Sequence, residues 1–180
     1  MTKLHQYRTP KAMSNDQELR EHLLYLLRGG GAHIDFDSVV KDFPIKLINQ
    51  KVEHIPYSAW QLLEHMRIAQ WDILEFCRNA KHISPPWPEG YWPKDDASAD
   101  AKAWRKSLHA FRADLEAIEE LLADSKADLF AQIKHGDGQT VLREVLLVAD
   151  HNAYHLGVLF TIKKLLLASN RRTSLNRRKR

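Results

Sequence analysis

The sequence has a single cysteine, Cys77, among its 180 residues. One thiol can form no internal disulfide and cannot supply the cysteine pairs on which thiolate zinc sites depend. The sequence therefore excludes a disulfide framework and a cysteine-rich zinc module. A near absence of disulfide-forming cysteine is typical of a reducing compartment, so we expect a cytoplasmic location.

Long apolar runs are missing as well. Stretches such as residues 165–168 are far shorter than the roughly 20 apolar residues that span a bilayer. The beginning of the chain, MTKLHQYRTP, contains no apolar core of the signal-peptide type. We expect neither a membrane span nor a leader, and a hydrophobic content of 44% favours one soluble globular domain.

Acidic residues are absent from the end of the chain, RRTSLNRRKR, which holds six of the 27 lysines and arginines. Without those six, the chain carries 21 basic residues against 23 acidic ones, so the net charge of +4 belongs to this end. Such a balance offers no basic surface for a phosphate backbone, and nucleic acid is not an expected partner. We expect residues 1–170 to form the domain and residues 171–180 a disordered tail; nucleic-acid contact through the tail is the alternative.

Four long segments show the apolar spacing of amphipathic helices, and no segment shows the convincing period-two alternation of strands. The expected helices cover about residues 15–28, 56 or 58 to 79, 98–124 and 140–168. Asn15 is a good cap for the first of them, and the glycines that follow it at 29–31 stop it. A short extra helix, capped by Asp35 or Asp37, should end before Pro44. The pattern predicts an all-α fold, a four-helix bundle with long connections.

The connection SPPWPEGYWPKDD is rich in proline and aromatic residues. Its four prolines exclude a regular helix or a central strand. Trp87, Tyr91 and Trp92 are too large and apolar to remain in water, so this loop should fold back onto the domain. Packing against the bundle is the default role, and a wall or lid of a substrate pocket is the alternative.

Two histidines lie on an apolar face in DHNAYHLGVL, where His151 and His155 are one helical turn apart. Burying an imidazole without partners costs about 1–3 kcal/mol, so an inward pair needs a common partner. A divalent metal bound at about 2.1 Å from each ring nitrogen is such a partner. Bonds to carboxylates or backbone, or a face turned to water, are the alternatives. A third ligand must come from another helix, and His65 in WQLLEHMRIAQWDIL is the candidate.

The segments LLEHMRIAQWDILEF and LREVLLVADHNAYHLGVL together resemble the DinB/YfiT-like family of metalloenzymes. The resemblance extends through GGGAHIDFD, PPWPEGYWP and GQTVLREVL, in the same order, over roughly residues 15–167. It implies a four-helix bundle of up-down-down-up topology, often dimeric, with a divalent metal held by His65, His151 and His155. Many relatives have glutamine where this chain has Val158, so a polar contribution from that position is not expected.

Three imidazole ligands leave coordination positions for water or substrate, which is typical of a catalytic metal site. Such an ion can activate water or a thiol, or polarise a carbonyl. The resemblance implies a transferase that uses a small thiol cofactor, a thiol-dependent isomerase or a hydrolase. We expect a small-molecule substrate, with zinc or nickel as the first metal candidates and iron or manganese after them. The alternative is a metal-binding bundle with a structural or interaction role and no catalysis.

A zincin-type peptidase is excluded, because Asn152 stands where the H-E-x-x-H motif has its glutamate base. Any general base must therefore come from another residue. Four acidic residues lie near the ligands in sequence, and each could either hydrogen-bond a metal ligand or lie on the surface: Glu64, Asp72, Glu144 and Asp150. His33, just past the glycines, is a weaker candidate for the open side of the metal. We expect Asn152 and Tyr154 to pack or hydrogen-bond between helices, and Cys77 to be a buried apolar residue.

Overall fold

The chain is helical throughout the part that the structure describes. The computed structural model describes residues 13–29 and 31–178, with side chains as far as residue 171. The elements in chain order are α1 (Asn15–Arg28), α2 (Phe36–Val40), the 3-10 helix η1 (Ile45–Leu47), α3 (Ala59–Arg78), the 3-10 helix η2 (Glu89–Tyr91), α4 (Ala101–Ala123) and α5 (Val141–Arg178). Extended pairing among these residues is limited to two isolated bridges. The predicted all-α class is confirmed.

Polar caps set the starts of the long helices. Ser14 caps α1 and Ser58 caps α3, each within a capping box in which a glutamine closes the reciprocal bond. Asp100 caps α4 by accepting a hydrogen bond from the backbone N–H of Ala103. The cap of α1 is therefore one residue before the predicted Asn15, and α4 begins slightly later than predicted, because Asp100 is the residue that caps it.

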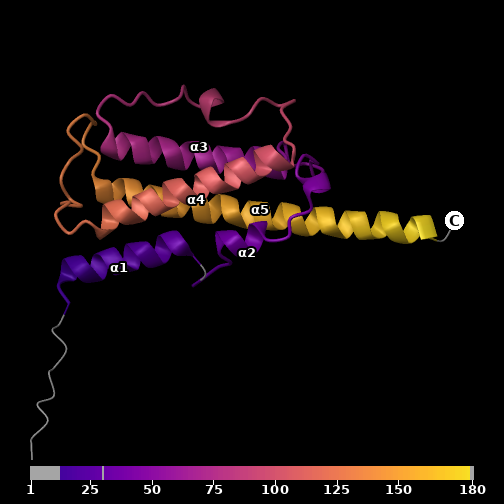
Figure 1. Ribbon diagram of the computed structural model, residues 1–180, viewed down its shortest axis with the longest axis horizontal. Coiled ribbons are helices and arrows are strands. Elements are labelled where there is room, and N and C mark those ends of the chain that lie inside the picture. Colours follow the sequence, from indigo (N-terminus) through magenta and orange to yellow (C-terminus); the bar gives the residue numbers. More distant parts are fainter. Residues whose placement is uncertain (1–12, 30, 179–180) are drawn as a thin grey trace, which may run out of the picture.

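The last helix continues well past its predicted end near residue 168. α5 runs to Arg178 and extends beyond the other helices (Figure 1). The predicted end is wrong because residues 169–178 contain no glycine or proline to stop the helix, and arginines near a helix C-terminus interact favourably with its dipole. Most of the predicted basic tail is thus helical, and residues 179–180 lie outside the described part. The separation of the tail from the domain stays a prediction.

Among the described helices, α5 is long and apolar enough over Val141–Arg171 to cross a membrane, by length and composition alone. The core helix of a bundle meets the same criterion. Here α5 packs against α1, α2 and α3, and its Leu159 and Ile162 are completely buried among them. The criterion alone therefore does not place α5 in a membrane.

The four long helices surround a common interior. α3 contacts α4 and α5, and α1, on the other side of the molecule in Figure 1, contacts the same two helices. Two clusters of buried apolar side chains fill this interior. Along α5, Val148 belongs to one cluster and Leu156 to the other. His151 and His155 therefore lie where the two clusters meet.

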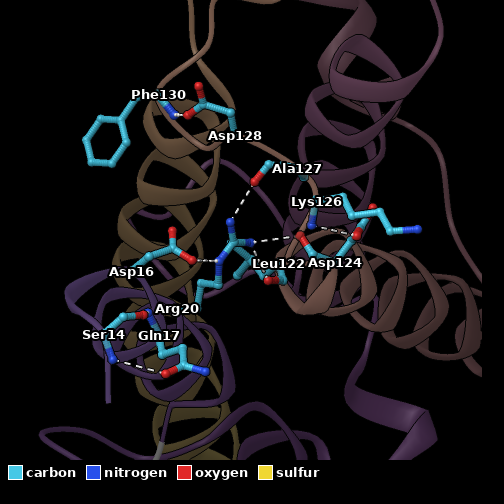
Figure 2. A network of polar contacts seen from close by, with 10 residues as sticks. All are labelled: Ser14, Asp16, Gln17, Arg20, Leu122, Asp124, Lys126, Ala127, Asp128 and Phe130. Atoms are coloured by element: carbon cyan, nitrogen blue, oxygen red, sulfur yellow. Dashed lines mark hydrogen bonds and ion pairs between the residues drawn. The ribbon is translucent and has the colours of Figure 1, made fainter. Parts of the chain in front are cut away.

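Arg20 joins α1 to the end of α4 (Figure 2). Its guanidinium donates to the carbonyls of Leu122 at 2.8 Å, Asp124 at 3.1 Å and Ala127 at 2.6 Å, and it pairs with Asp16 at 2.8 Å. Carbonyls at a helix C-terminus have no partner within the helix, so they need such donors. Only 7% of Arg20 is exposed, and this buried cation fixes α1 against the connection from α4 to α5.

Candidate metal centre

The three histidines predicted as ligands meet between α3 and α5. His65 comes from α3, and His151 and His155 come from α5. Nε2 of His65 lies 3.1 Å from Nε2 of His151 and 3.2 Å from Nε2 of His155. One nitrogen from each ring lies within 4.8 Å of the others. Tetrahedral ligands about 2.1 Å from a metal are roughly 3.4 Å apart, so these nitrogens are spaced to hold one ion.

Helix geometry and packing bring the three rings together. His151 and His155 are four residues apart on α5, so their side chains project from one face and meet the facing side of α3. His65 and His155 are buried, with 4% and 8% of their surface exposed, while His151 is half-buried. Buried histidines need partners for their ring nitrogens, so these rings should have hydrogen-bond or metal partners.

The Nε2 atoms of the three rings face one another, and a metal ion would be a common partner for them. Nδ1 of His65 donates to the carbonyl of Tyr91 at 3.0 Å, so Nε2 of the neutral ring carries a lone pair toward the other two histidines. The convergent atom of His155 is Nε2 as well, while its Nδ1 is buried without a hydrogen-bond partner and would stay unpaired with a metal on Nε2. A metal bound by the Nε2 atoms would take all three lone pairs at once. The residues present therefore fit a divalent metal.

Burial keeps these imidazoles neutral. Desolvation lowers the pKa of His151 to about 4 and that of His155 to about 3, and the neighbouring histidines add to both shifts. Desolvation also lowers the pKa of His65. The neutral ring is the form that binds a metal, so near neutral pH no proton has to be removed before an ion can bind.

Aromatic residues from the proline-rich loop cover one side of the cluster. The Trp92 indole stacks on the His65 ring, with centroids 3.8 Å apart and planes 4° from parallel. Tyr91 and Trp92 are half-buried against the bundle, so the prediction that the loop folds back is confirmed for both. It is wrong for Trp87, which is 74% exposed and makes an edge contact with Tyr91. Trp92 limits the access of water to His65.

Tyr91 is a residue of the site that sequence reasoning missed. Its carbonyl accepts the His65 hydrogen bond, while its phenol donates to Oδ2 of Asp72 at 2.6 Å. Nε2 of His82 donates to the other oxygen of Asp72 at 2.7 Å. Burial and the bond to Asp72 raise the pKa of Tyr91 to about 12. A backbone carbonyl carries no side-chain signal, and the only hint in the sequence was a loop too aromatic to be left in water.

The other sequence candidates are not brought to the cluster. Glu64 and Glu144 form ion pairs with neighbouring arginines, and Asp150 is exposed. His33 is exposed too, and its Nδ1 donates to the carbonyl of the next residue. It lines a cavity of about 40 Å³ that also borders Asn152, rather than the three-histidine cluster.

Two further residues of α5 were predicted to make contacts between helices. Nδ2 of Asn152 donates to Oε1 of Gln70 on α3 at 2.8 Å, which confirms the prediction for Asn152. Tyr154 instead lies 68% exposed, with its ring 4.8 Å from that of His155. Val158 is partly buried against the core.

Cys77 is half-buried among apolar side chains of α3, α4 and α5, so the prediction of a buried apolar residue holds only in part. Burial raises the pKa of its thiol to about 12. Because the thiolate is the reactive form, Cys77 should react with dithiobis(nitrobenzoate) at pH 8 on the order of 100-fold or more slowly in folded protein than in urea. Thiol release followed by absorbance measures this. Equal rates in both conditions would contradict the burial of the thiol.

The fold and the cluster define an all-helical protein with three histidines able to hold a divalent metal. A model of the DinB superfamily matches residues 35–159, more than half of the chain, and the chain belongs to this superfamily. The match includes all three histidines but is shorter than the predicted resemblance over residues 15–167. No curated protein and no solved structure matches the chain.

Proposed function

We propose that the protein is a divalent-metal-dependent enzyme that acts on a small molecule, as a thiol-cofactor-dependent S-transferase or as a hydrolase. The observation that carries the proposal is the convergence of His65, His151 and His155, whose nitrogens lie within 4.8 Å of one another. When bound, the metal would supply a Lewis acid with open positions that activates a small thiol or water. Zinc or nickel is the first choice for such a ligand set, with iron or manganese after them.

The chain's own residues would hold and shield this centre. The neutral imidazoles present lone pairs, and Trp92 covers one face of His65. The carboxylates near the ligands in sequence are engaged elsewhere, for example Glu64 with Arg67 and Asp72 with Tyr91. This arrangement favours chemistry in which the metal, rather than a protein carboxylate, makes the nucleophile more acidic.

A structural metal in a bundle without catalysis is the second candidate. It is favoured by the burial of His65 and His155, with 4% and 8% exposed. A buried, covered ion would stabilise the packing of α3 against α5 and offer little room to a substrate. Metal binding without turnover of any thiol or hydrolysable substrate would support this reading over the enzyme.

The proposed ligand set is tested by His151→Ala, with His109→Ala as the matched control because His109 is exposed on α4. We expect wild type and His109→Ala to bind about one ion per chain, measured by plasma mass spectrometry and by titration with Zn²⁺ and Ni²⁺. His151→Ala should bind at least about 100-fold more weakly, because two ligands make a poor site. Activity in small-thiol conjugation and ester hydrolysis should fall with it.

A wild-type chain that binds no divalent ion would contradict both the proposed metal-dependent enzyme and the proposed structural metal. Equal affinity in His151→Ala and wild type would remove His151 from the ligand set. Full occupancy without any activity across substrates would leave the structural role.

We also propose that α1, α3, α4 and α5 form an up-down-down-up four-helix bundle and that the protein is a cytoplasmic homodimer. The contacts of α3 and α1 with both α4 and α5 support the bundle. Leu147, Tyr154 and Leu165 lie along one face of α5 and are 36%, 68% and 46% exposed, which supports a partner on this helix. Light scattering of the purified chain would test the dimer.

A further inference from the structure

The His65 ring is held on three sides. Its Nδ1 donates to the Tyr91 carbonyl at 3.0 Å, its face lies against Trp92 with centroids 3.8 Å apart, and its Nε2 faces the α5 histidines. Both loop contacts come from consecutive residues at the end of η2. The orientation of His65 therefore depends on where this short piece of loop lies against α3.

Tyr91 is itself anchored at its other end. Its phenol donates to Oδ2 of Asp72 at 2.6 Å, and His82 donates to Oδ1 of the same carboxylate at 2.7 Å. Asp72 is only 7% exposed. A buried carboxylate that accepts two short hydrogen bonds is a strong and directional anchor.

The spacing on α3 explains how one residue reaches both points. Asp72 follows His65 by seven positions, so the two lie on the same face about two turns, or roughly 10 Å, apart. Tyr91 spans this interval, with its carbonyl at His65 and its phenol at Asp72, and η2 packs directly on α3. One side chain thus sets the register of the loop against the helix that carries the ligand.

We propose that Asp72 and Tyr91 are positioning residues of the metal centre. Asp72 fixes the phenol of Tyr91, and the Tyr91 carbonyl thereby holds His65 in the tautomer and orientation that direct its Nε2 lone pair at the metal. This inference rests on the proposed function for its link to the metal. The orientation of the ring can be measured without any metal.

The chemistry of Asp72 makes the proposal specific. A carboxylate accepts from both Tyr91 and His82, whereas an amide offers one acceptor and one donor group. Asp72→Asn keeps the shape of the side chain but replaces one carboxylate acceptor with an amide donor, so Tyr91 and His82 can no longer both donate to it. Tyr91→Phe keeps the carbonyl and the ring and removes the hydroxyl that bonds to Asp72 and also interacts with Ser84. Tyr91→Phe therefore removes the link between the two residues from one end, and Asp72→Asn weakens it from the other.

The test uses the full chain as wild type, Tyr91→Phe and Asp72→Asn, with Tyr57→Phe as the control. Tyr57 stacks on Trp92 beside the site, with centroids 4.9 Å apart, so its variant loses a hydroxyl nearby without touching Asp72. Zn²⁺ affinity is measured by competition with a chelating indicator. Long-range ¹H–¹⁵N spectra of chelator-treated protein report which nitrogen of His65 carries the proton. Urea unfolding of each protein reports its stability.

We expect Zn²⁺ affinity to fall about 10- to 100-fold in both variants and to stay within about twofold of wild type in Tyr57→Phe. In the chelator-treated wild type, the proton of His65 should sit on Nδ1, and Tyr91→Phe should shift it toward a mixture of tautomers. If Tyr91→Phe does not fold, Asp72→Asn carries the same expectations.

If Asp72 and Tyr91 have only a structural role, both variants should have a lower free energy of unfolding but the Zn²⁺ affinity and the His65 tautomer of wild type. That result would overturn the inference. If wild type itself binds no Zn²⁺ or Ni²⁺, the proposed function fails. The tautomer spectra then decide alone whether Asp72 and Tyr91 position His65.

Discussion

Arg20→Ala is expected to lower the free energy of unfolding by about 3 kcal/mol, because it removes a buried cation and leaves one buried and two partly buried carbonyls without this donor. The guanidinium serves three carbonyls, those of Leu122, Asp124 and Ala127, from a position that is 7% exposed. The Leu122 carbonyl, whose bond is fully buried, loses its donor with little access to water, and the partly buried bonds to Asp124 and Ala127 add less. Urea unfolding followed by circular dichroism measures the change.

Two further variants make this prediction specific. Arg20→Lys should recover only part of the loss, since a single ammonium cannot reproduce the fork that reaches several carbonyls. Arg28→Ala should cost less than about 1 kcal/mol, because the Arg28 side chain that pairs with Glu119 is 62% exposed and solvent screens the pair. An Arg20→Ala protein no less stable than Arg28→Ala would show that the network in Figure 2 contributes little.

His155→Leu is expected to raise stability without metal and to abolish stabilisation by metal. His155 is 8% exposed and its Nδ1 has no hydrogen-bond partner, which costs about 1–3 kcal/mol when the ring is buried. Leucine fills a similar space without that penalty, so unfolding in chelator should become harder by about 1 kcal/mol. Sites built for function commonly carry such a cost in stability.

The loss of stabilisation by metal is the larger of the two expected effects. At an ion concentration 100 times the dissociation constant, wild type should gain about 2.7 kcal/mol, and His155→Leu should gain almost nothing. Urea titrations with Zn²⁺ and with chelator give both numbers. His109→Leu, at an exposed position on α4, should behave as wild type in both conditions. A variant that loses stability in chelator yet keeps the gain from Zn²⁺ would contradict the role of His155.

Local signals in the sequence predicted the helices well. Polar caps and glycine stops act within a few residues, so the spans of α1 and α3 follow from the chain itself. The end of α5 was missed because no stop residue marks it, and only the weak preference of its arginines for a helix C-terminus was available. The prediction for Trp87 was wrong because the size and apolarity of a side chain favour burial but do not determine where the chain places it.

The candidate ligands were predictable for different reasons. His151 and His155 share one helix, where a spacing of four residues guarantees a common face. His65 is 86 positions before His151 in the chain, and nothing local ties the two together. It was a candidate because it is a polar residue on an apolar helix, and the resemblance to a family supported it. Its meeting with the α5 histidines is a property of how α3 packs against α5.

By itself, the sequence determined the helical class, the approximate spans of α1 and α3 and the pair of histidines on one face of α5, because each depends on contacts between residues close in the chain. Only the tertiary structure decided that His65 completes the cluster. It also decided that the Tyr91 carbonyl accepts a hydrogen bond from His65, that Asp72 accepts one from the Tyr91 hydroxyl, and that Arg20 connects α1 to the end of α4. These contacts join segments far apart in the chain, and several use backbone carbonyls, which every residue has. Their positions follow from the packing of the whole bundle.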